Sequence, residues 1–190
     1  MTKQPLFLLL LSLLFVAGGM ASTVSAAGKG FYDDGQTKWE YLFEEGAISE
    51  ARWYSETGEL ISRETYVAGQ ADKTEGYRLD GSLEWQVKPL EEGRQEVTRF
   101  DLEGQKTELY QTVAGQVDGV YTTFYGTGQA KQKVTYSQGV LNGPATTFFP
   151  SGQVEHEFSY SNGEVDGLYR TYSEEGKLLS EYTFLNGQLQ

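Results

Sequence analysis

Glycine recurs at a nearly fixed interval along most of the chain. Successive members of a first set lie 23, 23, 23, 24, 24 and 24 residues apart. This set comprises Gly35, Gly58, Gly81, Gly104, Gly128, Gly152 and Gly176. A second set follows the first by 11 residues, or by 12 in the third repeat, and comprises Gly46, Gly69, Gly93, Gly115, Gly139, Gly163 and Gly187. A period of this length is typical of repeat proteins. The sequence therefore predicts seven repeats, each with two turns and two strands.

Many of these glycines lie in dipeptides that favour hairpin turns. Examples are Asp34-Gly35, Asp80-Gly81, Asn162-Gly163 and Asn186-Gly187. Such turns need positive φ angles, which Gly and Asn adopt at low steric cost. No stretch after residue 26 has a convincing helical period. We therefore expect an all-β chain in which one hairpin follows another.

Aromatic residues alternate with polar ones between the turns. Every repeat has an aromatic residue four positions before its first glycine, and this column is Phe31, Tyr54, Tyr77, Phe100, Phe124, Phe148 and Tyr172. Further aromatic residues recur six and eight positions after that glycine, as in Tyr41 and Phe43. Side chains alternate between the two faces of a strand. The even offsets therefore predict one continuous aromatic face that serves as the structural core of the sheet.

Four further aromatic residues have odd offsets, and the repeat does not require an aromatic residue at those positions. We predict that they point away from the aromatic face, which holds Trp39 and Trp85, and that they form an interface. These candidate interface residues are Tyr32, Trp53, Tyr125 and Phe149.

The last repeats resemble a known family. Residues 167–187, GLYRTYSEEGKLLSEYTFLNG, are similar to the bacterial variant of the MORN repeat, which occurs in proteins described as YwqK-type antitoxins. The resemblance covers residues 31–187 and is best in repeats five to seven, which open with Asp118-Gly119, Asn142-Gly143 and Asp166-Gly167. It implies an elongated antiparallel sheet of about seven consecutive hairpins, with a binding or scaffold role.

The third repeat departs from this pattern. Lys88-Pro89 falls within its second strand, and one extra residue precedes Gly93. Proline lacks the N–H group that a β-ladder needs, so we expect a bulge or an unpaired segment at this place.

The first residues have the features of an export signal. Lys3 precedes an apolar run from Leu6 to Met20, and Val24-Ser25-Ala26 is a small-x-small cleavage site. The alternative, a transmembrane anchor, needs about 20 apolar residues. We therefore predict a signal peptide at residues 1–26, cleavage after Ala26, and a repeat domain at residues 27–190 in the periplasm or outside the cell.

Composition argues against several classes of function. The formal net charge is −12, which disfavours nucleic acid and anionic lipid as partners. The chain has no Cys and a single His, His156, and its paired carboxylates lack the alternating ligands of a calcium loop. No pair of carboxylates stands out for acid–base catalysis. We therefore predict no enzyme activity, cofactor or metal.

Together these features predict an exported interaction or scaffold module that binds a protein or an extended peptide. Two alternatives remain: an antitoxin or immunity protein that binds one toxin, and an envelope protein that contacts cell wall or lipid. The sequence continues only three residues past Gly187, so we also expect an open edge at residues 178–184 through which copies could associate.

Overall fold

Each long strand of the sheet pairs in antiparallel fashion with the next long strand along the chain. The computed structural model describes residues 28–190, and these form one sheet of 17 strands. The strands are β1 (Gly28–Phe31), β2 (Thr37–Glu44), β3 (Ala47–Tyr54), β4 (Leu60–Val67), β5 (Gln70–Tyr77), β6 (Leu83–Pro89), β7 (Arg94–Phe100), β8 (Lys106–Val113), β9 (Gln116–Val117), β10 (Gly119–Phe124), β11 (Ala130–Ser137), β12 (Val140–Phe148), β13 (Val154–Ser161), β14 (Glu164–Val165), β15 (Gly167–Tyr172), β16 (Leu178–Leu185) and β17 (Gln188–Leu189). The predicted all-β sheet of consecutive hairpins is confirmed. The predicted signal peptide, residues 1–26, lies outside the described residues.

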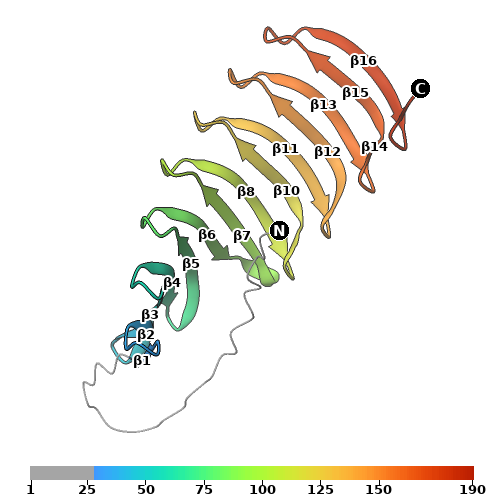
Figure 1. Ribbon diagram of the computed structural model, residues 1–190. Helices are drawn as coiled ribbons and strands as arrows, with labels where there is room; N and C mark the ends of the chain where they lie inside the picture. Colours follow the sequence, from blue (N-terminus) through green and yellow to red (C-terminus); the bar gives the residue numbers. More distant parts are fainter. Residues whose placement is uncertain (1–27) are drawn as a thin grey trace.

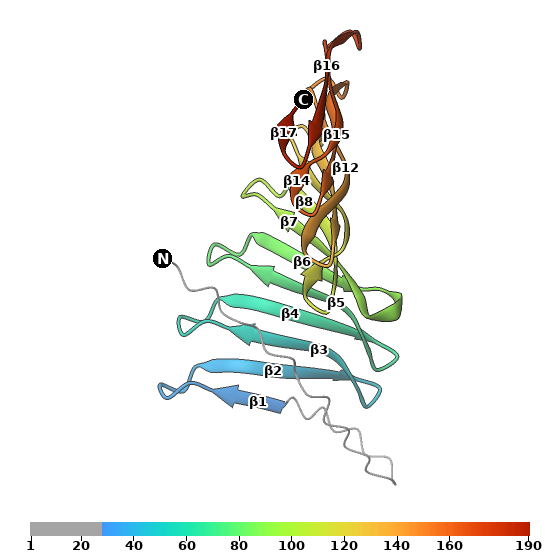
Figure 2. The same ribbon diagram turned by 90° about the vertical axis from the view of Figure 1, so that its right-hand side faces the viewer.

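The sheet is a single twisted layer. Hairpins follow one another like steps from the blue end to the red end, and no second layer covers either face within residues 28–190 (Figure 1). The first strands are seen broadside in the view where the last strands are seen edge-on (Figure 2). The first and last strands therefore differ in orientation, because a twist accumulates from each strand to the next.

The first glycine of each repeat closes a three-residue turn. Tyr125 N–H donates to the carbonyl of Gln129 at 2.8 Å, and Gly128 N–H donates to the carbonyl of Tyr125 at 2.9 Å. The same two bonds recur in all seven repeats. Gly128 has a φ of 84°, a conformation that side chains with a β-carbon rarely adopt. The regular glycine spacing thus corresponds to a repeated hairpin turn.

The second glycine closes a tighter turn in six of the repeats. Asn162 and Gly163 both have positive φ, 51° and 91°, as a two-residue type I′ turn requires. The third repeat differs because a short 3₁₀ turn, η1 (Glu91–Gly93), fills a three-residue loop that Leu90 N–H closes onto the carbonyl of Arg94.

Of the two outcomes expected near Pro89, the bulge is absent, but an unpaired segment is present on the β5 side, where Lys88 and Pro89 have no partner in β5. Strands β6 and β7 pair without a register shift from Trp85 to Pro89. Because Leu90 N–H points towards β7, the nitrogen of Pro89 points the other way, where pairing between β5 and β6 has already ended at Val87. Pro89 therefore removes no bond from the β6–β7 ladder, and the extra residue is taken up in the loop.

The opening glycines of repeats five to seven lie at bulges. Gly119, Gly143 and Gly167 have φ angles of 96°, 118° and 88°. Between β11 and β12, Val134 pairs with Ala145 but Tyr136 pairs with Leu141, so β12 holds two extra residues at this point. Such bulges bend the strand and increase its local twist.

Cross-strand pairing defines the two faces of the sheet. We call one the ring face, where Tyr121, Val134, Ala145, Phe158, Tyr169 and Tyr182 lie opposite one another on successive strands. We call the other the charge face, where Glu40, Arg52, Arg63 and Glu75 form a similar row.

The aromatic column before the first glycine lies on the charge face, contrary to the sequence prediction of one aromatic face. Tyr54 donates a hydrogen bond to Glu40, and Tyr172 donates one to Glu157 on the same face. Offsets predict a face only within one strand. Between this column and the next strand lies the turn of the first glycine, which is accompanied by a register shift, as at Thr123/Phe124. This shift changes the parity of the count.

Few side chains are fully buried in this single layer. The buried apolar residues are Ala51, Val134 and Ala145, and the buried polar ones include Glu40 and Glu75. The sheet is therefore held by ladder hydrogen bonds and by contacts between neighbouring strands.

The last long strand is partly covered. Its far end pairs with β17 at Phe184 and Leu185, and Gln190 N–H donates to the carbonyl of Thr183 at 2.9 Å. Within residues 28–190, Leu178–Tyr182 has a strand partner only on the β15 side.

Candidate interaction surfaces

Two tryptophans of the ring face lie across glycines of the neighbouring strand. Trp85 is directly opposite Gly76, and Trp39 is opposite Gly30. A β-carbon added at Gly76 would lie 2.1 Å from Cε2 of Trp85, and one at Gly30 would lie 2.2 Å from Nε1 of Trp39. Each glycine is therefore required for an indole to lie flat on the sheet.

Aromatic rings stack across strands farther along the ring face. The ring centres of Tyr110 and Tyr121 are 5.0 Å apart, and those of Phe158 and Tyr169 are 4.9 Å apart. Both pairs are nearly parallel, an arrangement that adds about 0.5–1.5 kcal/mol beyond burial. The rings are half-buried by one another, so part of each remains accessible to a partner.

The charge face holds a network of paired charges in the first repeats. Glu75 accepts hydrogen bonds from Arg63, from Lys73 at 2.7 Å and from the hydroxyl of Tyr77 at 2.8 Å. Its side chain is only 7% exposed. A second centre forms around Glu40, which contacts Lys29 at 2.9 Å, Arg52 at 3.5 Å and the hydroxyl of Tyr54 at 2.6 Å.

These contacts set the protonation of the carboxyl groups. Burial alone would raise the pKa of Glu75, but the hydrogen bonds from Lys73, Arg63 and Tyr77 together lower this pKa to about 2. The hydrogen bond from Tyr54, followed by that from Lys29, lowers the pKa of Glu40. Burial, with a hydrogen bond to Glu75, raises the pKa of Tyr77 to about 12. Both carboxylates are therefore ionised and both phenols neutral near pH 7.

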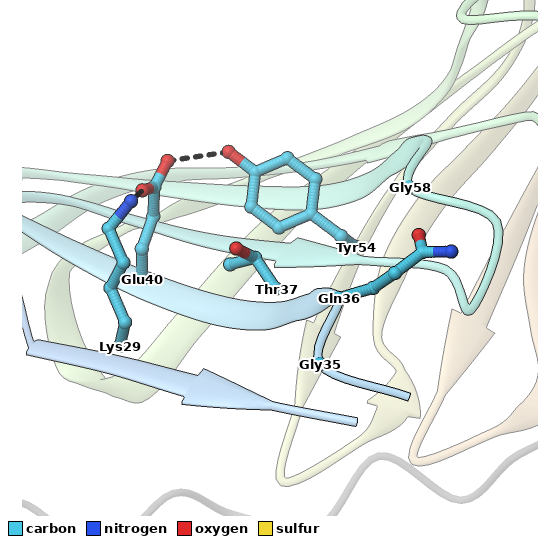
Figure 3. A pocket seen from close by; sticks show the side chains of 7 residues that line it. All are labelled: Lys29, Gly35, Gln36, Thr37, Glu40, Tyr54 and Gly58. Atoms are coloured by element: carbon cyan, nitrogen blue, oxygen red, sulfur yellow. Dashed lines mark hydrogen bonds and ion pairs between the residues drawn. The ribbon is translucent and has the colours of Figure 1, made fainter. Parts of the chain in front are cut away.

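A hollow opens on the charge face beside Tyr54 (Figure 3). Its lining comprises Lys29, Gly35, Gln36, Thr37, Glu40, Tyr54 and Gly58. The ring of Tyr54 forms one side, and the hydroxyl of that ring reaches the carboxylate of Glu40. The hollow is open to solvent, so it can hold a side chain of a partner but cannot enclose a small substrate.

Two of the predicted interface residues tie neighbouring repeats together. The hydroxyl of Tyr32 donates to the carbonyl of Tyr54 at 2.8 Å, and that of Tyr125 donates to the carbonyl of Phe148 at 2.6 Å. Arg78 occupies the same repeat position and donates to the carbonyl of Phe100. An aromatic residue is not required at this position, since Ser55, Asp101 and Ser173 also occupy it. Where the residue is a long donor, however, it bonds to the next repeat, and this structural role of Tyr32 and Tyr125 was not expected from the sequence.

The other two predicted interface residues lie apart from each other. Phe149 occupies the Tyr125 position but lacks a hydroxyl, and it is half-buried. Trp53 is directly opposite Trp39, so the prediction that these indoles face opposite ways is wrong. The odd offset of Trp53 misled the count because the turn between the strands changes parity.

Sequence reasoning missed Arg78, Glu40 and Glu75. A signal was present for Arg78, because it shares a repeat position with Tyr32 and Tyr125. The charge pairs could not be found without the register that places Arg63 beside Glu75.

The single histidine lies on the ring face. His156 is opposite Thr171, and its ring centre is 5.5 Å from that of Tyr169. Its Nδ1 is buried with no hydrogen-bond partner among residues 28–190, contrary to the hydrogen-bonded state that is usual for a histidine in a sheet.

Residues 28–190 contain neither a cluster of metal-ligating side chains nor a membrane-spanning helix. No group of three or more His, Cys, Asp and Glu side chains in this part of the chain is placed to hold a metal ion. Among the same residues there is no helix with the length and apolarity needed to cross a bilayer.

Residues 49–68, 117–138, 141–162 and 165–190 match the family of the MORN repeat variant. These four stretches are similar to the MORN repeat. MORN repeats indicate a repeat protein with a binding role. The last three stretches include the bulged opening glycines Gly119, Gly143 and Gly167, while the third repeat with Pro89 lies outside every match.

The solved structures similar to this chain include two of low similarity. One is a variant of TarM from S. aureus in complex with fondaparinux, alpha-GlcNAc-glycerol and UDP, with 10% identity and a TM-score of 0.41. The other is TarM itself, with 10% identity and a TM-score of 0.39. Each match covers 54% of this chain and 20% of the solved chain. No curated protein matches the chain.

Proposed function

We propose that this chain is an exported, non-enzymatic repeat protein that binds a protein partner through its ring face. The observation that carries the proposal is the presence of two groups of half-buried rings, around Tyr121 and around Phe158 and Tyr169, on a face that no element covers within residues 28–190. Tyrosine and tryptophan offer large rigid apolar surfaces with a polar edge, and they are enriched where proteins bind one another. The acidic chain favours a partner with a basic surface.

The ring face can be tested by capture from a periplasmic extract. The native chain is compared with a Tyr121→Ser/Tyr160→Ser double variant of the ring face and with Lys133→Ser on the charge face. We expect a saturable complex with the native chain and with Lys133→Ser, and none with the double variant. Circular dichroism checks that all three chains fold. A complex that the double variant retains would contradict the proposal.

Export is tested separately. The sequence of the first 26 residues supports it, and we expect the protein in the periplasm or the medium to begin at Ala27. A protein that begins at Met1 in the membrane fraction would show that the first segment is an anchor.

The same capture experiment bears on the two alternatives. The resemblance to YwqK-type antitoxins supports a toxin as partner, which would require that the captured protein stops growth and that the native chain restores it. Binding to cell-wall pellets or vesicles without any protein partner would support an envelope role and contradict the proposed module.

A further inference from the structure

The hollow beside Tyr54 has an equivalent one repeat farther along the charge face. The second hollow is lined by Glu59, Leu60, Arg63, Tyr77, Leu79, Asp80 and Gly81. Five of these residues lie 23 positions after lining residues of the first hollow: Gln36 and Glu59, Thr37 and Leu60, Glu40 and Arg63, Tyr54 and Tyr77, Gly58 and Gly81. The volumes are also similar, about 510 Å³ and 540 Å³. The hollow therefore recurs with the repeat period within the first three repeats.

Each hollow combines a fixed ring with polar groups. The hydroxyl of Tyr54 is held by Glu40, and that of Tyr77 by Glu75. Because the hydroxyls are tied to carboxylates, the two rings stand as rigid apolar walls before any partner binds. Gln36 extends across the first hollow to within 3.3 Å of the place where a β-carbon of Gly58 would lie. Its amide can donate a hydrogen bond to a carbonyl of a bound chain.

The spacing of the hollows selects among peptide conformations. One repeat is two strands wide, which corresponds to about 9.4–9.8 Å. A polyproline II helix advances about 9.3 Å in three residues, after which the side chain points the same way. A β-strand presents the same side about every 6.7 Å, and an α-helix advances about 10.5 Å in seven residues. The polyproline II repeat is therefore the closest match.

Negative charge exceeds positive charge in the turns around the hollows. Glu59 and Asp80 line the second hollow, and a neighbouring depression holds Asp33, Asp34 and Glu56 together with Lys38. None of these five carboxylates forms an ion pair among residues 28–190. Glu40 and Glu75, by contrast, are neutralised by Lys29, Arg52, Arg63 and Lys73. A partner that fills the hollows with apolar residues would thus gain from positive charge between them.

We propose that the charge face of the first three repeats binds a basic, proline-rich segment in the polyproline II conformation, with every third residue in one hollow. Proline-rich segments suit such aromatic walls because they are already ordered before binding and leave their carbonyls free. This surface is on the opposite side of the sheet from the ring face, so the proposal goes beyond the function proposed above and can fail independently of it.

Calorimetric titration of the full chain with synthetic peptides tests the proposal. The probe peptide is three repeats of Pro-Pro-Arg, and the composition control is six prolines followed by three arginines. We expect the probe to bind at least tenfold more tightly than the control, and at least tenfold more tightly than three repeats of Pro-Pro-Glu. Equal affinities for probe and composition control, or tighter binding of a basic amphipathic helical peptide, would overturn the proposal.

Two variants locate the binding site. Thr37→Phe fills the first hollow, and Thr74→Phe places the same side chain on the ring face, where Thr74 pairs with Val87. We expect Thr37→Phe to weaken binding of the probe at least tenfold and Thr74→Phe to change it less than twofold. If Thr37→Phe does not fold, Gln36→Ala at an exposed position replaces it, with an expected loss of at least threefold. Equal effects on the two faces would contradict the proposal.

Discussion

At the scale of the residue, the tight turns place some residues other than glycine in a backbone conformation that they disfavour. The residue before the second glycine has a positive φ in every repeat, and it is Glu45, Ala68, Glu92, Ala114, Gln138, Asn162 or Asn186. Left-handed backbone costs a residue with a β-carbon roughly 1 kcal/mol, and Asn tolerates it better. The last two repeats therefore have better turn residues than the others.

Ala114→Asn should accordingly stabilise the protein. Ala114 is exposed and has a φ of 49°, close to the 51° of Asn162. We expect a gain of about 0.5 kcal/mol in the free energy of unfolding, measured by urea denaturation. The reverse change, Asn162→Ala, should lose a similar amount. A loss of stability in Ala114→Asn would contradict the turn assignment.

A glycine beneath an indole gives a second prediction. Gly76→Ala would place a methyl group where the Trp85 indole lies, so the indole must move off the sheet. We expect a loss of about 2 kcal/mol, together with a change in tryptophan fluorescence. Gly126→Ala is the control, because Gly126 has open space around it and no positive φ. Equal effects of the two changes would show that Trp85 does not lie across Gly76.

At the scale of the element, neighbouring repeats are joined by side chains as well as by ladders. The residue three positions before the first glycine is Tyr32, Arg78 or Tyr125 in three of the repeats, and its side chain donates a hydrogen bond to a backbone carbonyl of the next repeat. Phe149 has the same place but no donor. The equivalent acceptor for repeat six would be the carbonyl of Tyr172.

This hydrogen bond between neighbouring repeats can be removed in one repeat and added in another by substitution. Tyr125→Phe should lose about 1 kcal/mol, the usual net contribution of a hydrogen bond, and Phe149→Tyr should gain up to about the same amount. Thermal or urea unfolding measures both. If Phe149→Tyr has no effect while Tyr125→Phe destabilises, a donor at this position is not sufficient to form the bond in every repeat, and the repeat-wide role is wrong.

The charge network makes the free energy of unfolding depend on pH in the acidic range. The pKa of Glu75 is about 2 in the folded chain and about 4.5 in the unfolded one. Its ionised form therefore stabilises the fold fully above about pH 4.5, and this contribution is lost as the pH falls towards 2. Relative to the native chain, Glu75→Gln should lose up to about 3 kcal/mol at neutral pH and much less at pH 2. Glu103→Gln, in an exposed turn, is the control. A Glu75→Gln defect that is the same at pH 7 and pH 2 would contradict the assignment.

The elements themselves could be predicted from the sequence, but their faces could not. The glycine period locates all seven first turns, because those turns need positive φ wherever they occur. The placement of Trp53 and of the aromatic column that includes Phe124 and Phe148 fails, because the register shift beside each turn leaves no mark in the residue count. The hollow beside Tyr54 likewise depends on residues of adjacent repeats that only the pairing brings together.

At the scale of the whole molecule, the two halves of the sheet are stabilised differently. The network around Glu40 and Glu75 lies in the first repeats, whereas most of the stacked rings, such as Phe158 and Tyr169, lie in the later ones. Each repeat contacts only its neighbours, so the total stability approximates a sum of local terms. The sheet can therefore leave its ring face uncovered without losing its fold.

Small-angle X-ray scattering of residues 28–190 tests the single-layer sheet most directly. Strands spaced about 4.8 Å apart give a sheet roughly 60 Å long, for which we expect a radius of gyration of roughly 20 Å. A compact domain of this length has a radius of gyration of about 15 Å. We predict a monomer with a radius of gyration of about 20 Å and a maximum dimension above about 60 Å. A monomer with a radius of gyration of about 15 Å would mean that the sheet folds back on itself and covers the ring face. That result would contradict the single-layer sheet.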